Sequence, residues 1–324
     1  MKKLEIFDKS LFITGGAGFI GVNLLEFFLK NNNSTITVYD NFTVGSKDHL
    51  AKFKDNKKLN VIEGDCRDLD FLTKSMSGSE TVIHLAANSD ISAAALDPII
   101  DFNIGTVLTQ NILEAMRLNS VSKIFFTSGS GVYGDVENIP VSENYGDKYP
   151  VSTYGASKLS SEALISAYSF MYNIDATVFR FANVVGPFHT HGVAFDFINK
   201  LKINNKELTI LGNGRQAKPY IHVDDIINAF VILSEKQKKQ FDVFNIAAND
   251  TLTVDQIAEI IIKEMKLSNV ALKYTGGERG WKADVPFYQL DTAKVEELGW
   301  LPSMNSYDAV KKSVKQNLNP LSKA

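Results

Sequence analysis

The sequence is poor in the residues that cross-link a chain or build a metal centre. Its 324 residues include one cysteine, Cys66, which cannot form an internal disulfide or supply a cysteine-rich zinc site. The formal net charge of −3 argues against a nucleic-acid-binding protein that relies on a basic surface. These absences favour a protein without a metal site and without a nucleic-acid partner.

Long hydrophobic runs are also missing. No apolar stretch approaches the ~18 residues that a membrane-spanning helix needs. The first residues, Met1 to Asp8, include an acid where a signal peptide would have an apolar stretch. We therefore expect a cytoplasmic protein that does not bind a membrane.

The first half of the chain alternates short apolar runs with helical patterns, and its length allows about two domains. We expect strands at 35–39, 59–62, 81–85, 122–127 and 174–181, and helices near 19–30, 98–118 and 153–172. This alternation predicts an α/β fold with a Rossmann-type, doubly wound parallel sheet. After Gly186-Pro187 the alternation weakens, which indicates a smaller C-terminal α/β lobe. The expected division is 1–182, with returning segments near 219–247 and 284–291, and 183–324.

The stretch from Thr14 to Gly21 connects a buried strand to an amphipathic helix. Its glycines Gly15, Gly18 and Gly21 are three residues apart. They provide a tight turn, room for a pyrophosphate and close packing of helix on strand. The helix N-terminus then offers free N–H groups to the phosphates. Although glycine turns also arise for purely local reasons, the strand, the helix and a downstream acid together predict a dinucleotide site.

The downstream acid is Asp40, which ends strand 35–39 near the ~20-residue offset at which an acid reaches the adenosine ribose. A carboxylate accepts both ribose hydroxyls but repels a 2′-phosphate, which favours NAD over NADP. The alternative is that Asp40 is only a turn residue. Asp65, after strand 59–62, is a candidate for the adenine amino group. His84 is interpreted as structural, and Leu85 to Ala87 let a dinucleotide lie close to the backbone.

The second strong pattern is Tyr154-Gly-Ala-Ser-Lys158 at the start of a helix, where residues four apart share one face. A phenol with a pKa of about 10 is a poor base at neutral pH. The ammonium of Lys158 and a positive nicotinamide ring both favour the phenolate. Tyr154 would then remove a hydroxyl proton as hydride leaves the same carbon. An ordinary surface pair is the alternative, because the spacing is common by chance.

A hydroxyl to assist Tyr154 is expected at the end of strand 122–127, because parallel strands present catalytic groups at their carboxyl ends. Ser128 and Ser130 are the candidates in the run Ser-Gly-Ser-Gly. The alternative is that this run forms a flexible turn.

Together these residues resemble the extended short-chain dehydrogenase/reductase family, in particular its nucleotide-sugar epimerase and dehydratase branch, over about residues 10 to 302. The resemblance implies bound NAD, catalysis by Tyr154 and Lys158, and a C-terminal sugar-nucleotide lobe. It also implies a homodimer formed through the helices near 98–118 and 153–172. The residues it implies for the cofactor are Gly15, Gly18, Phe19, Ile20, Gly21, Asp40, Asn41, Asp65, Cys66, Leu85, Ala86, Ala87, Asn103, Tyr154, Lys158 and Phe181.

Three segments of the second half carry the resemblance to the substrate side of the family: Arg180 to Pro187, Leu211 to Asp225, and Thr275 to Trp281. The resemblance implies that Asn183 and Arg279 contact a diphosphate, a role that the planar fork of arginine suits. A solvated loop charge is the alternative for Arg279. The expected substrate-binding residues are Asn183, Val193, Leu211, Lys218, His222 and Arg279.

Two positions depart from the family pattern. Gly129 stands where many members have the catalytic serine or threonine, so Ser128 is the first choice and Ser130 the second. Lys218 stands where arginine is common, and a lysine is a point charge rather than a fork. Arg215 is a possible compensation for that change.

The resemblance favours a nucleotide-sugar epimerase acting at C4 through a transient 4-keto sugar. A 4,6-dehydratase, a decarboxylase or a 4-oxidase is the alternative. The loop around Ser130 has no carboxylate to eliminate water; Glu143 is a possible donor, with a solvated loop residue as the competing interpretation. A dinucleotide-sensing protein without catalysis is a remote third reading. The base and the sugar stay open, because they depend on residues such as Asn88, Ser89, His189 and His191.

Overall fold

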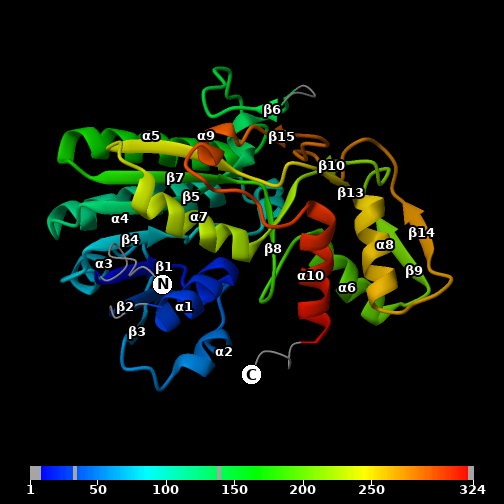
Figure 1. Cartoon of the computed structure of the whole chain (residues 1–324), viewed down its shortest axis with the longest axis horizontal. Coiled ribbons are helices and arrows are strands. Elements are labelled where there is room, and N and C mark those ends of the chain that lie inside the picture. Colours follow the sequence, from blue (N-terminus) through cyan, green and yellow to red (C-terminus); the bar gives the residue numbers. More distant parts are fainter. Residues whose placement is uncertain (1–8, 32–34, 137–139, 320–324) are drawn as a thin grey trace.

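A seven-stranded, fully parallel sheet forms the centre of the protein (Figure 1). The computed structural model describes residues 9–31, 35–136 and 140–319; the first eight residues, on which the signal-peptide expectation depends, lie outside it. In spatial order the strands are β3 (Leu59–Glu63), β2 (Ile36–Asp40), β1 (Leu11–Thr14), β4 (Thr81–His84), β5 (Lys123–Gly129), β7 (Asp175–Phe181) and β12 (Phe241–Ile246).

Helices cover both faces of this sheet, because the strands bury side chains on alternating sides. Phe125 and Phe179 lie on the face covered by α1 (Phe19–Asn31) and α7 (Val223–Lys236). Phe126 and Val178 lie on the opposite face, covered by α3 (Leu69–Ser75), α4 (Val107–Leu118) and α5 (Thr153–Tyr172). The α/β, Rossmann-type fold predicted from the sequence is confirmed.

The strand order reverses at β1, which lies between β2 and β4 although it comes first in the chain. Thr14 and His84 pair at the carboxyl ends of β1 and β4. Ligands of open α/β sheets bind at the carboxyl ends of the strands, at the point where the strand order reverses. The glycine stretch leaves β1 here, and Leu85 to Ala87 leave β4.

The helix expected at 98–118 is less regular than predicted. A π-helical segment, Phe102–Thr106, precedes α4, and Ile104 inside it has a non-helical conformation with φ −100° and ψ 15°. A single 3₁₀ turn, Ile91–Ala95, lies before it. Apolar side chains are exposed on both regions expected to form the homodimer, including Phe102 (54%) in the π-helical segment and Met171 (68%) on α5, but the homodimer stays a prediction. Within the described residues no helix is both long and apolar enough to cross a lipid bilayer.

The C-terminal lobe has a core of its own, lined by residues such as Phe197, Leu201, Ile257 and Val310. Its main elements are α6 (Val193–Ile203), β9 (Glu207–Ile210), α8 (Val254–Glu264), β14 (Ala271–Tyr274) and α10 (Ser306–Leu318), on the right in Figure 1. Short strand pairs connect them: β8 (Asn183–Val185) with β11 (Tyr220–His222), β10 (Ala217–Lys218) with β13 (Leu252–Thr253), and β9 with β14.

Two later segments of the chain lie against the sheet domain. Helix α7 contacts α1, and β12 pairs with β7 as the last strand of the sheet. Strand β15 (Gln289–Leu290) pairs with β6 (Pro140–Val141). The short helices α2 (Lys47–Leu50) and α9 (Ala293–Glu296) complete the description. The domain boundary at residue 182 stays a prediction.

Candidate active site

The glycine loop after β1 is too crowded for side chains at the positions that the sequence singles out. Gly15 has φ +69°, and a Cβ there would lie 2.8 Å from the backbone nitrogen of Ala86. A Cβ on Gly21 would lie 2.6 Å from Cα of Gly16, so α1 packs directly against the loop. The glycines therefore let the loop pack closely on the chain that leaves β4 and on the start of α1. This geometry fits the pyrophosphate of a dinucleotide at the N-terminus of α1.

Asp40 connects the end of β2 to the glycine loop. It is 7% exposed; its Oδ2 accepts a hydrogen bond from Ala17 N at 2.9 Å and its Oδ1 one from Phe42 N at 2.9 Å. Burial raises the pKa of this carboxyl, and the two amide hydrogen bonds oppose that rise. Two lone-pair sites are left for ribose hydroxyls. Asp40 thus holds the loop together, and its ribose role stays a prediction.

Asp65 and its neighbours form the far wall of the expected adenosine site. Arg67 binds Asp65 at 2.6 Å and lowers the pKa of that carboxyl to about 2, and Asn41 donates a second hydrogen bond to it. Cys66 is buried, which raises the pKa of its thiol. The other residues implied for the cofactor are partly exposed or buried, and their role stays a prediction: Phe19, Ile20, Leu85, Ala86, Ala87, Asn103 and Phe181.

A Gly15→Ala variant is expected to bind NAD at least about tenfold more weakly than the wild type, because the added methyl must displace the backbone at Ala86. Gly78→Ala is the matched control. Gly78 also has a left-handed conformation, φ +78°, but a Cβ there meets nothing within 4 Å. Both variants carry the backbone strain of about 1–2 kcal/mol, so calorimetric titration with NAD isolates the effect of the collision. Equal affinities for NAD in the two variants would contradict the prediction that the loop containing Gly15 binds the cofactor.

The first two turns of α5 present Tyr154 and Lys158 on one face. Ser152 begins the helix by accepting a hydrogen bond from Gly155 N at 3.0 Å. Lys158 is 5% exposed, and its Nζ donates to the carbonyl of Thr127 at 2.7 Å. The same Nζ lies 5.7 Å from the centre of the Tyr154 ring. The expected catalytic pair therefore lies at the carboxyl end of β5.

The chain on its own does not acidify the phenol. Burial raises the pKa of Tyr154 to about 12, and the negative charge of Asp101 adds to the rise. Burial lowers the pKa of Lys158 to about 8, against the opposing charges of Glu162 and Asp101. Desolvation and the charge of Asp101 thus set the direction in which the pKa of Tyr154 is shifted. Acidification of Tyr154 needs a further positive charge, such as an oxidised nicotinamide.

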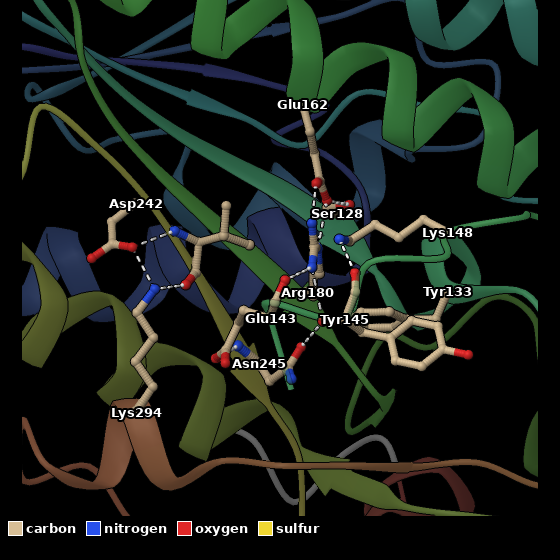
Figure 2. Close-up of polar contacts among 11 residues, drawn as sticks. Ser128, Tyr133, Glu143, Tyr145, Lys148, Glu162, Arg180, Asp242, Asn245 and Lys294 are labelled. Carbon is tan, nitrogen blue, oxygen red and sulfur yellow. Dashed lines mark hydrogen bonds and ion pairs between the residues drawn. The ribbon is translucent and has the colours of Figure 1, made fainter. Parts of the chain in front are cut away.

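The two serine candidates lie in different surroundings. Ser128 is 5% exposed, and its hydroxyl donates to Glu162 Oε1 at 2.6 Å (Figure 2). Ser130 begins a short 3₁₀ segment, is partly exposed and forms a hydrogen bond with Tyr288. Because the Ser128 hydroxyl is committed to a buried carboxylate, the geometry favours Ser130 as the assisting group. The sequence pattern gives the opposite order, and the choice between the two serines stays a prediction.

Ser128 belongs to a buried polar network at the ends of β5, β7 and β12. In Figure 2, Arg180 lies below Glu162; its Nη2 binds Oε2 at 2.6 Å and its Nε binds Oε1 at 3.0 Å. Arg180 also donates to the Tyr133 hydroxyl, which donates to Asn245 Oδ1. Glu143 accepts a hydrogen bond from Asn245 N at 2.8 Å, and burial raises its pKa. Glu143 is therefore partly buried, with one carboxylate oxygen bound to the backbone of β12.

The cations expected to bind the substrate diphosphate already have carboxylate partners. Lys218 pairs with the buried Asp284. Arg279 pairs with Asp135 at 2.5 Å and also donates to the carbonyl of Asp284. Nδ2 of Asn183 donates to the Tyr288 hydroxyl at 3.1 Å. These groups lie together, but a diphosphate would have to compete with the carboxylates.

The remaining expected substrate residues are more scattered. His222 is fully buried and begins α7: its Nδ1 accepts a hydrogen bond from Asp224 N, and its Nε2 lies 3.0 Å from Gln316 Oε1. That environment gives His222 a structural position and does not support a substrate contact. Val193 begins α6 and is partly exposed, and Leu211 is 47% exposed beside Gly280.

Asp101 and Tyr288 lie near the site and were not predicted from sequence, whereas His84 and His189 were named there. Asp101 is 1% exposed and lies close enough to Tyr154 to affect its ionisation. Tyr288 binds both Ser130 and Asn183. Neither Asp101 nor Tyr288 stands in a recognisable local motif. His189 has a buried Nδ1 without a hydrogen-bond partner in the described structure, and its ring lies 4.8 Å from that of Phe19. His84 is buried between Thr14 and Thr109, as its structural interpretation requires.

Comparison with known proteins gives a consistent result. A family model described as the NAD dependent epimerase/dehydratase family matches residues 11–247. A putative UDP-glucose 4-epimerase of Methanocaldococcus jannaschii is 32% identical over 310 residues, with 94% of this chain and 97% of that protein covered. A crystal structure of a UDP-galactose 4-epimerase has a TM-score of 0.85 at 31% identity and covers 96% and 99% of the two chains. A UDP-glucuronic acid 4-epimerase of Bacillus cereus, solved with UDP-glucuronic acid and NAD, has a TM-score of 0.85 at 26% identity over 94% and 98%.

Proposed function

Because the chain belongs to the NAD-dependent epimerase/dehydratase family, whose cofactor is NAD, we propose that it is a nucleotide-sugar 4-epimerase. The observation that carries the proposal is the placement of Tyr154 and Lys158 on one face of α5, at the carboxyl end of β5. The nucleotide-sugar 4-epimerases among its relatives support the same reaction, and their uridine nucleotides favour a UDP-hexose as substrate.

In this proposal separate groups of residues bind the cofactor, exchange the proton and bind the diphosphate. Bound NAD supplies an acceptor and a donor of hydride. The glycine loop and Asp40 would hold its pyrophosphate and ribose, and Lys158 would bond its nicotinamide ribose. Tyr154 takes the proton of the sugar C4 hydroxyl and returns it after the 4-keto sugar has rotated in the site. Ser130 donates a hydrogen bond to the reacting oxygen. Asn183, Lys218 and Arg279 hold the diphosphate.

Epimerisation suits this site better than dehydration, which needs an acid and a base beside the sugar. Ser130 and its neighbours supply no carboxylate. Glu143 binds the backbone of Asn245, and Asp101 accepts hydrogen bonds from Asn88 and Thr153. Both carboxylates are therefore engaged by protein donors. A dehydratase or decarboxylase is the alternative that the product experiment must exclude.

The purified protein with bound NAD is expected to convert a UDP-hexose into an isomer of the same mass. A panel of UDP-, GDP-, CDP- and dTDP-sugars, followed by mass spectrometry and NMR, gives the base, the sugar and the reaction in one experiment. Loss of water would indicate dehydration, and loss of carbon dioxide would indicate decarboxylation. Because hydride returns to the sugar in an epimerase, steady accumulation of free NADH during turnover would overturn the proposal.

A further inference from the structure

A buried carboxylate outside the expected catalytic pair lies beside Tyr154. Asp101 is 1% exposed and immediately precedes the π-helical segment Phe102–Thr106. π-helical turns inside helices often occur at functional sites. Asp101 is far from α5 in sequence, and nothing in the proposed reaction uses it.

Two hydrogen bonds fix Asp101 between elements that border the site. Its Oδ2 accepts from Thr153 Oγ1 at 2.6 Å, and Thr153 is the residue before Tyr154. Its Oδ1 accepts from Asn88 Nδ2 at 2.9 Å, and Asn88 lies in the loop that leaves β4. One carboxylate therefore joins the loop after β4, the π-helical segment and the first turn of α5.

The π-helical segment itself is pressed against α5. Thr106 Oγ1 donates to Ser157 Oγ at 3.3 Å, and a Cβ on Gly105 would lie 2.0 Å from the same oxygen. Ser157 precedes Lys158, so the segment contacts α5 beside both members of the pair. A displacement of Asp101 would therefore be transmitted to the start of α5.

Few charged groups face the pair from the elements packed around it. Glu162, one helical turn beyond Lys158, is neutralised by Arg180. His84, on β4, is buried and its pKa is lowered to about 3, so it carries no charge at neutral pH. Asp101 is thus the negative charge near Tyr154 that has no cationic partner among the hydrogen bonds and ion pairs of the described residues.

We propose that Asp101 is a positioning residue, which orients the first turn of α5 through Thr153 and sets the electrostatic balance between Tyr154 and Lys158. The sign of the electrostatic effect is the same for both groups: the negative charge raises the pKa of Tyr154 and the pKa of Lys158. It keeps Lys158 protonated, and it keeps Tyr154 protonated until a positive charge is bound. The effect of Asp101 on the rate of the reaction rests on the proposed function, whereas its effect on the two pKa values does not.

The test uses the NAD-loaded protein and two complementary variants. Asp101→Asn removes the charge and keeps a similar shape, whereas Thr153→Val keeps the charge and removes the hydrogen bond. Asp97→Asn is the control, because Asp97 is an exposed carboxylate four residues before Asp101. If Asp101→Asn does not fold, Asp101→Ser removes the charge with a smaller side chain. The ionisation of Tyr154 is followed by phenolate absorbance, as a difference from Tyr154→Phe, without any sugar substrate.

In Asp101→Asn, the midpoint of Tyr154 ionisation is expected to fall by on the order of one pH unit. Both limbs of the pH profile of kcat/KM should move toward acid by a similar amount. Thr153→Val should leave the midpoint in place and lower kcat. An unchanged midpoint in both charge-removing variants, or an equal shift in Asp97→Asn, would overturn the proposal. If no sugar nucleotide is turned over by the wild type, the proposed function fails, but the absorbance titration still decides the role of Asp101.

Discussion

A Tyr154→Phe variant is expected to turn over its sugar nucleotide about 10²–10⁴-fold more slowly than the wild type. The substitution removes one oxygen, and with it the group that exchanges the proton of the sugar hydroxyl. The ring of Tyr154 stays in place against Lys158, so folding and NAD content should change little. The measurement is kcat with the substrate found in the sugar-nucleotide panel, together with the amount of NAD released on denaturation.

The matched control is Tyr149→Phe. Tyr149 lies in the segment before α5 and is 75% exposed, so the loss of its hydroxyl should leave kcat unchanged. Unaltered turnover by Tyr154→Phe would show that the reaction uses another acid and base. A fall in NAD content parallel to the fall in kcat would instead identify Tyr154 as a binding residue.

Replacing Arg180 with Met should lower the free energy of unfolding by about 3–5 kcal/mol, because it leaves Glu162 buried without its ionic partner. Both side chains of this pair are 5–6% exposed, and Ser128 and Tyr133 complete the network. Urea unfolding of the NAD-free protein gives the difference directly. The double variant Arg180→Met/Glu162→Leu should recover part of the loss, since the unpaired charge is gone.

Arg117→Met is the corresponding control on the surface. Arg117 pairs with Glu114 on α4 with side chains 39% and 26% exposed, and such exposed pairs contribute little. If both arginine variants unfolded at the same urea concentration, the buried pair would have no special role in holding the ends of β5 and β7 to α5.

Most of the sheet domain could be predicted from the sequence, because its signals are local. The buried strands contain short apolar runs, as at 124–126 and 178–179. A strand, three spaced glycines and an amphipathic helix identify the first crossover without any knowledge of what lies around them. The pair Tyr154 and Lys158 can be predicted from the sequence for the same reason, because both residues stand on one helix.

The parts that the sequence could not give depend on contacts between distant residues. Ser128 and Ser130 stand in the same short run of serines and glycines. Only the contact of Ser128 with Glu162 on α5 distinguishes their surroundings. Asp101 carries no local signal, because its partners Asn88 and Thr153 come from other elements. The strands of the lobe, such as β10 and β13, are two residues long, too short for a periodic pattern to predict them.

The pairing of β12 with β7 has a consequence for how the protein is made. The chain leaves the sheet after Phe181 and builds α6, β9 and α7 before Phe241 returns to the edge of β7. A growing chain on the ribosome therefore carries β7 as an uncovered edge while that intervening stretch is translated, and uncovered edges recruit foreign strands. Translation pauses within 182–240 should accordingly prolong the period in which the nascent protein needs chaperones most.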